Sequence, residues 1–273
     1  MSKPRKKCIF CGGTGMSREH IWGDCLKPHV PRTVNKHRLQ SVVVNRPGVP
    51  STSSLHIRAG DPMGSNVRVV CKPCNNGWMS RLQNAVKPIL LPLIRGERTV
   101  LGQRAQETLS AWTTMAVMTS EHIDPAAHMV AVSQSERDAF SQHQAAFPNW
   151  QIWIGRYQRH RWVGQWVHTA MPVLGTKDIP ADKDAPVPPP NTQTTTIILG
   201  QLYILAISSE FADIPVKWGW AGVPTVPARL ARISPPKESI IAWPPSSLTD
   251  QEAEALSHAF FDWIDGIGRA NGF

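Results

Sequence analysis

Two short segments decide the N-terminal fold of this chain, Cys8-Ile-Phe-Cys11 and Cys71-Lys-Pro-Cys74, and the second runs directly into Asn75-Asn-Gly-Trp78. Both are C-x2-C turns, and 59 residues separate them. Each turn presents two sulfurs to one ion, so two turns together close a tetrahedral four-cysteine zinc site. The sequence therefore predicts a structural Zn²⁺ ion bound by Cys8, Cys11, Cys71 and Cys74. The alternative is that these are unrelated core cysteines.

The segment between the two turns is longer than a simple zinc ribbon needs, so we expect a folded insertion there. It contains the remaining cysteine, Cys25, which has no partner at C-x2-C spacing. We expect Cys25 to be a buried thiol and not a fifth ligand.

Charge is unevenly distributed along the chain. Residues 1–100 contain 17 Lys and Arg and four acids, a net charge of +13, whereas residues 101–273 have a net charge of −4. A local excess of this kind favours a polyanionic partner, and nucleic acid is the one we expect. A basic surface kept for solubility is the alternative.

Composition excludes several classes of protein. Of the 273 residues, 41% are apolar, which is enough for a buried core and argues against wholesale disorder. No apolar run approaches the length of about 18 residues that a membrane span needs. The basic residues 1–7 lead into Cys8 without the apolar stretch of a secretory signal, so we expect a reducing, cytoplasmic setting and no membrane partner.

Three residues close to the cysteine turns suit phosphodiester hydrolysis. This reaction needs a base to activate water and a divalent cation to stabilise the leaving oxygen. His20 has a side chain that titrates near neutral pH, and Glu19 offers a hard oxygen ligand for Mg²⁺ or Mn²⁺. Asn75 offers a neutral amide oxygen one residue beyond the predicted zinc site.

This arrangement of four cysteines, an acid-His pair and an Asn after the last Cys resembles the HNH endonucleases over roughly residues 8–87. The resemblance implies a zinc-braced ββα-metal domain in which Glu19 and Asn75 bind the catalytic Mg²⁺ or Mn²⁺ ion. By the same resemblance His20 is the general base, and the zinc ion is purely structural. The commoner His-Asn-His version has a second His on the helix. Met79 and Ser80 stand in that region here, so the match is to the acid-His-Asn variant.

Several assignments stay open at this stage. Asn76 is a rival to Asn75. Arg18 is a candidate phosphate contact or an ordinary surface residue. The basic residues of the insertion either follow a phosphate backbone or are simply solvated, and they are Lys27, Arg32, Lys36, Arg38, Arg46 and Arg58. His29, His37 and His56 are surface or hydrogen-bonding residues more often than additional ligands.

The fold class that we predict is α+β, with a zinc-stabilised HNH nuclease domain over 1–100 and a mixed α/β domain of unknown role over 101–273. We expect a helix from Asn75 that Pro88 interrupts, with a C-cap at Gly96 after a second apolar stretch, and a helix over 105–120. Strands over 151–155 and 162–167 would be joined by a turn. A long strand over 194–208 would bend at Gly200, and a shorter strand would follow over 239–243. A final helix would run over 250–267, with Ser247 or Thr249 as its N-cap.

Four tryptophans surround the basic turn at 157–161, where they could stack on unpaired bases. They are Trp150, Trp153, Trp162 and Trp166. Because tryptophan on a strand is usually core, we expect them to be buried.

The sequence thus predicts a metal-dependent HNH endonuclease acting on DNA. One alternative is a non-catalytic, zinc-stabilised nucleic-acid-binding protein. Another is a structural zinc domain in a larger assembly. The C-terminal domain could also mediate homo-oligomerisation.

Overall fold

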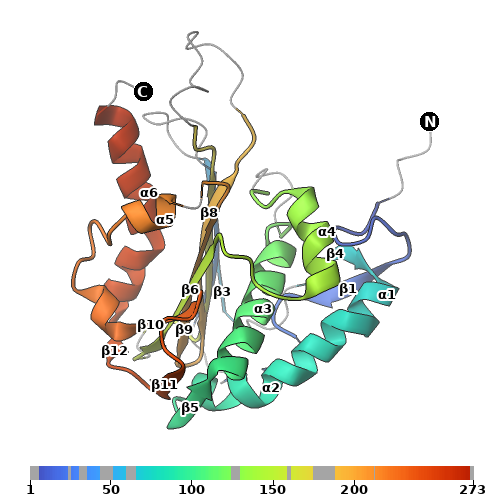
Figure 1. The fold of residues 1–273 in the computed structure, drawn as a ribbon, viewed down its shortest axis with the longest axis horizontal. Helices are drawn as coiled ribbons and strands as arrows, with labels where there is room; N and C mark the ends of the chain where they lie inside the picture. Colours follow the sequence, from blue (N-terminus) through green and yellow to red (C-terminus); the bar gives the residue numbers. More distant parts are fainter. Residues whose placement is uncertain are drawn as a thin grey trace.

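The computed structural model describes residues 6–23, 26–30, 36–43, 52–59, 66–123, 130–158, 161–174, 188–211 and 213–270. These residues form a mixed α and β fold organised around one large sheet (Figure 1). Helix α6 covers one face of the sheet and α3 lies on the other face, with α2, α4, β1 and β4 beyond α3. No described helix combines the length and apolar character that crossing a membrane requires.

The large sheet has eight strands in the order β10-β6-β9-β8-β7-β2-β3, with β12 pairing to β6. Its strands are β2 (Lys36–Val43), β3 (Thr52–Ala59), β6 (Trp150–Tyr157), β7 (Gly164–Met171), β8 (Thr192–Leu199), β9 (Leu202–Ser209), β10 (Leu230–Ser234) and β12 (Ser247–Leu248). Strand β2 pairs in parallel with β7. The insertion between the cysteine turns therefore extends a sheet built mainly by the C-terminal half. The predicted division at residue 100 stays a prediction, and this sheet joins strands from both sides of it.

The cysteine-bearing region has its own small sheet. Strands β1 (Met16–His20) and β4 (Asn66–Cys71) pair antiparallel. A continuous helical segment follows through α1 (Lys72–Cys74), the wider turn η3 (Asn75–Met79) and α2 (Ser80–Arg95). It kinks at Gly77, whose backbone angles are not helical. The order is therefore strand, strand and helix, with the large insertion between the two strands.

The remaining helices and strands connect these parts. They are β5 (Thr99–Gly102), α3 (Gln103–Ser120), α4 (Gln134–His143), α5 (Ile214–Lys217), η5 (Val226–Arg229), β11 (Ile240–Trp243) and α6 (Asp250–Ala270), and β5 pairs with β11. The expected helices over 105–120 and 250–267 and the strand over 239–243 are confirmed. Thr249 caps α6 as predicted, because its Oγ1 accepts from Glu252 N and its own N donates to Glu252 Oε2.

Two local expectations were wrong, and two expected strands form without pairing to each other. Helix α2 continues through Pro88 and ends in the left-handed Gly96, because burial of side chains such as Leu90 and Leu93 offsets the hydrogen bond that proline removes. Strands β6 and β7 do not pair with each other, since β9 and β8 lie between them. Residues 194–208 form two antiparallel strands that reverse at Gly200, where φ is +58°, and not one bent strand.

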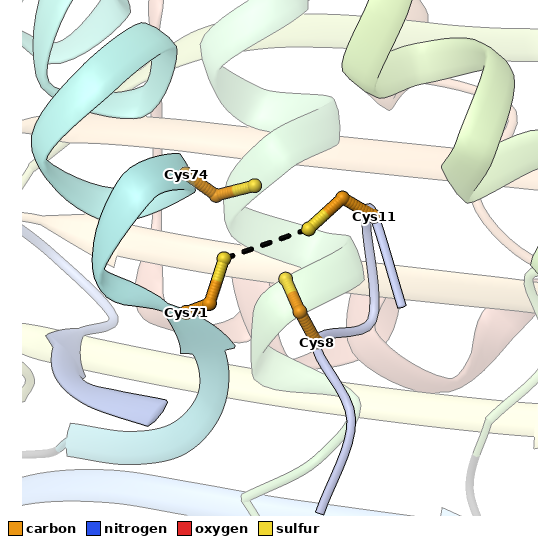
Figure 2. Close-up of side chains that lie close together, drawn as sticks. All are labelled: Cys8, Cys11, Cys71 and Cys74. Carbon is orange, nitrogen blue, oxygen red and sulfur yellow. Dashed lines mark hydrogen bonds between the residues drawn. The ribbon is translucent and has the colours of Figure 1, made fainter. Parts of the chain in front are cut away.

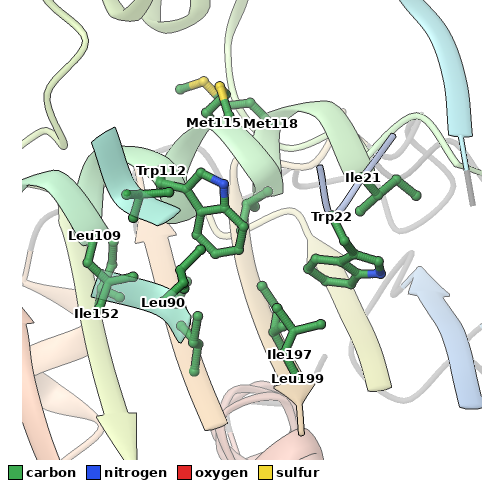
Figure 3. Close-up of a cluster of buried hydrophobic side chains, with 14 of the residues drawn as sticks. Ile21, Trp22, Leu90, Leu109, Trp112, Met115, Met118, Ile152, Ile197 and Leu199 are labelled. Atoms are coloured by element: carbon green, nitrogen blue, oxygen red, sulfur yellow. The ribbon is translucent and has the colours of Figure 1, made fainter. Parts of the chain in front are cut away.

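Apolar packing on both faces holds the sheet between its helices. One core joins α2 and α3 to the sheet, and Figure 3 shows its members Leu90, Trp112, Ile152 and Ile197. A second core lies under α6 and includes Phe260. The four tryptophans of the sheet region are all buried, as expected for core residues and not for a base-stacking surface.

Candidate functional site

The four predicted zinc ligands come together in space (Figure 2). Their sulfur atoms all lie within 4.8 Å of one another, and Cys11 Sγ is 3.5 Å from Cys71 Sγ. Tetrahedral zinc with Zn–S bonds of about 2.3 Å separates its sulfurs by about 3.8 Å. The cluster could therefore hold a structural metal ion such as zinc.

Backbone geometry around the first turn keeps this cluster in place. Cys8 N donates to Gly13 O at 2.8 Å, and Gly12 N donates to Cys8 O at 2.9 Å. Gly12 has a φ of +66°, a conformation that favours glycine. A Cβ at Gly13 would lie 3.2 Å from Cys11 Sγ, so a side chain there would crowd a ligand atom. The pair of glycines after the first turn therefore shapes the cysteine cluster directly.

Burial makes two of the four thiols unfavourable as free thiolates. Desolvation raises the pKa values of the Cys71 and Cys74 thiols above their usual range, whereas at Cys8 hydrogen bonds outweigh desolvation and lower the pKa. A divalent cation reverses this preference, because it binds the deprotonated sulfur and offsets the desolvation cost. The donor set is thus suited to a thiophilic ion such as zinc.

Glu19 is a buried carboxyl group facing the start of α2. It is 4% exposed, and its Oε1 accepts a hydrogen bond from Gln83 Nε2 at 2.8 Å. Burial raises the pKa of Glu19 to about 7, and the bond from Gln83 opposes this only in part. A buried carboxyl with so large a shift is a candidate functional group.

His20 is the last residue of β1 and pairs with Asn66 of β4. It is partly exposed, whereas its neighbour Glu19 is buried. Side chains alternate across a strand, so the two point to opposite faces of the small sheet. Glu19 faces α2, and His20 lies on the more accessible face.

Asn75 ties the helical segment to β1. Its Nδ2 donates to Ser17 Oγ at 3.0 Å and to Arg18 O at 3.1 Å. The amide therefore lies beside the residues that immediately precede Glu19. Asn76, the rival candidate, is exposed to solvent. The register that places an Asn directly after the last Cys thus brings Asn75, and not Asn76, against β1.

Gln83 is a residue of this site that the sequence analysis did not identify. It lies in a helical stripe whose other members, Met79, Val86 and Leu90, are all buried and apolar. A polar side chain in such a stripe needs a hydrogen-bonding partner, and here that partner is Glu19. A polar residue within an otherwise apolar helical stripe is the feature of the sequence that could have pointed to Gln83.

The other candidate histidines lie apart from this pair. His29 Nδ1 is 2.9 Å from an Arg95 nitrogen, His37 is buried within β2, and His56 is exposed on β3. Among the described residues, the four cysteines are the only group of three or more thiol, imidazole or carboxylate side chains close enough to share an ion. A divalent cation at Glu19 would therefore need amide oxygens or water as its other ligands.

The basic residues divide into separate groups. Arg18 is exposed beside Glu19 and His20, and Lys27 is partly buried. Arg38 is buried and forms an ion pair with Glu254 of α6, which removes it from any phosphate-binding surface. Cys25, Arg32 and Arg46 lie outside the described residues, as do the side chains of Lys36 and Arg58.

Comparison with protein-family models, with curated proteins and with solved structures gives no match for this chain. The assignment of function therefore depends on the residues and their geometry.

Proposed function

We propose that this chain is a metal-dependent endonuclease of the HNH type that hydrolyses phosphodiester bonds in DNA. The observation that carries the proposal is the order of the cysteine-bearing region. Antiparallel β1 and β4 are followed directly by a helix. The four cysteines bring the segment before β1 together with the junction of β4 and the helix, and the Glu19-His20 pair is at the end of β1. This order is that of a ββα-metal domain.

His20 is the proposed general base. Its position at the end of β1, on the more accessible face of the small sheet, leaves its imidazole within reach of a nucleotide chain. There it would accept the proton of the attacking water. The neighbouring peptide is held by the Asn75 bonds to Ser17 and Arg18, which restrict the movement of β1 just before the catalytic pair.

Glu19 would hold Mg²⁺ or Mn²⁺ through its carboxylate. His20 lies on the other face of β1, so an ion held by Glu19 could act on the phosphate that His20 serves only where the strand ends, at these two residues. There it would supply charge stabilisation at the scissile phosphate and the leaving oxygen. The Asn75 amide oxygen is the proposed second ligand. Gln83 donates from its Nε2 to Glu19, so its amide would have to rotate before its oxygen could join them. Hard cations favour oxygen donors of these kinds. The zinc site and the catalytic site would thus be separate, with sulfur ligands in one and oxygen ligands in the other.

A plasmid-cleavage assay at low salt tests the proposal, with wild type and His20→Ala compared in Mg²⁺, Mn²⁺ or EDTA. Metal-dependent nicking or linearisation by wild type that is lost in His20→Ala supports both the activity and the base. His56→Ala is the matched control, since this histidine is exposed on β3, and it should cut like wild type. Cutting that persists in His20→Ala would contradict the assignment of the base.

A non-catalytic nucleic-acid-binding module is the second candidate, favoured by a specific observation. Within the described part of α2 no histidine joins Glu19, and the residue that contacts it is a glutamine. Such a protein would bind DNA with strong salt dependence and release no cut product with any divalent ion. Binding without cleavage by wild type would favour this second function.

A further inference from the structure

A bulge in the small sheet brings two arginines opposite each other. Ser17 pairs with Val70 and Glu19 pairs with Val67, so two residues of β4, Arg68 and Val69, lie opposite the single residue Arg18. Bulges of this kind change the direction of side chains and are common beside active sites. Here the change places two guanidinium groups on neighbouring strands.

Neither arginine has an acidic partner among the described residues. Both are exposed, and no ion pair or side-chain hydrogen bond of either is present in that part of the chain. Glu19 is buried against Gln83, and Glu97 pairs with Arg95. Like charges on opposed strand positions destabilise a sheet unless an anion lies between them.

The position of this pair relates it to the proposed base. Arg18 and His20 are two residues apart on β1, so their side chains lie on the same face of the strand. Asn66, which pairs with His20, is exposed on β4 two residues before Arg68. The accessible face of the small sheet therefore carries the base and both guanidinium groups, while the opposite face carries the buried Glu19.

We propose that Arg18 and Arg68 together bind phosphates of a DNA backbone that lies across the accessible face of β1 and β4. The guanidinium group suits this role because it donates two parallel hydrogen bonds to phosphate oxygens and keeps its charge at every physiological pH. The choice of DNA rests on the proposed function. The proposal that Arg18 and Arg68 bind phosphate together does not depend on whether the chain cleaves DNA.

Fluorescence anisotropy with a short labelled DNA duplex tests the pair without added Mg²⁺ or Mn²⁺, so that cleavage is not supported and the four-cysteine site is not exposed to a chelator. Wild type, Arg18→Gln, Arg68→Gln and the double variant are titrated over a range of salt concentrations. We expect the double variant to bind about tenfold more weakly at low salt and to lose about 2 from the slope of log K against log salt. Arg98→Gln/Arg104→Gln is the charge-matched control, since both arginines are exposed and lie outside the small sheet.

The outcomes separate this inference from the proposed function. Equal affinity of wild type and the double variant overturns it, as does a wild type that does not bind the duplex at low salt. An equal loss in the Arg98/Arg104 control also overturns it, because general charge would then explain the effect. If the double variant binds DNA more weakly, as expected, but wild type cuts no DNA with any divalent ion, the nuclease proposal fails and the phosphate-binding pair stands. Circular dichroism and zinc content show whether each variant is folded.

Discussion

Arg38 of β2 and Glu254 of α6 form an ion pair across 216 positions of the chain, with Arg38 Nη1 at 2.8 Å from Oε1 and 2.6 Å from Oε2 of the carboxylate. The arginine side chain is 8% exposed and the glutamate side chain 36%. The pair attaches the insertion between the cysteine turns to the final helix. A strand that the cysteine motif alone would assign to the N-terminal domain is thus bound to the C-terminal half.

This pair predicts a pH-dependent contribution to stability. Hydrogen bonding from His258, with the Arg38 charge, lowers the pKa of Glu254 to about 2. The stabilisation is present above the ordinary glutamate pKa of about 4.3 and is lost as the pH falls towards 2. Glu254→Gln should cost about 1 kcal/mol at pH 7, a value reduced for solvent screening, and the difference from wild type should vanish near pH 2. Urea unfolding at several pH values measures it.

The exposed pair Lys217–Asp213 is the control for that measurement. Asp213→Asn should leave the unfolding midpoint unchanged, because both partners are in solvent. An equal effect of Asp213→Asn and Glu254→Gln would show that net charge, and not the Arg38 contact, sets the difference.

The four-cysteine cluster predicts one zinc ion for each chain. Cys71→Ser should lose the metal and lower the melting temperature sharply, because structural zinc contributes on the order of 10 kcal/mol to folding in small zinc domains. A strong chelator should have the same effect on wild type. Atomic absorption gives the zinc content and calorimetry the melting temperature.

Cys25→Ser is the matched control for the metal measurement. If Cys25 is not a ligand, this variant keeps its zinc and Cys71→Ser does not. Full zinc content in Cys71→Ser would remove that residue from the site.

The two hydrogen bonds of Asn75 predict a structural role that Asn76 lacks. Asn75→Ala removes donors to Ser17 Oγ and Arg18 O and should destabilise the protein by about 1 to 2 kcal/mol. Asn76 is exposed, so Asn76→Ala should unfold at the wild-type midpoint. Chemical denaturation of both variants compares them, and equal midpoints would show that the bonds to β1 contribute nothing.

The buried carboxyl of Glu19 predicts the opposite pH dependence from Glu254. Its pKa is raised to about 7, so its contribution to stability is complete below the ordinary glutamate pKa and is lost as the pH rises through 7. Glu19→Gln cannot ionise and should be more stable than wild type at pH 8, on the order of 2 kcal/mol. Thermal unfolding without added Mg²⁺ or Mn²⁺ at pH 5 and pH 8 measures this difference. A gap of the same size at both pH values would contradict the assigned shift.

The parts of the fold that could be predicted from the sequence are those with local causes. The convergence of the C-x2-C turns could be predicted because a single tetrahedral ion would need two such turns, and Gly96 ends α2 because it adopts the left-handed conformation of a C-cap. The start of α6 follows from the reciprocal hydrogen bonds of Thr249 and Glu252. The sequence also places Asn75 directly after Cys74, and the structure holds its side chain against β1.

Pairing between distant strands could not be predicted in the same way. Residues 151–155 and 162–167 are close in sequence, yet β9 and β8 separate the strands that they form. The choice of neighbour depends on which apolar faces bury together in the complete sheet, and a period-two pattern does not contain this information. Pro88 illustrates the same limit, because packing of the helix against its neighbours outweighs a local preference to end there.

The sequence by itself determined the two C-x2-C turns, the acid-His pair and the local caps, because each depends on residues a few positions apart. Only the tertiary structure decided that Gln83 contacts Glu19, that Arg18 and Arg68 lie opposite each other and that β2 extends the C-terminal sheet. These contacts join residues far apart along the chain. Their formation depends on the burial of whole faces of helix and sheet, which no short segment specifies.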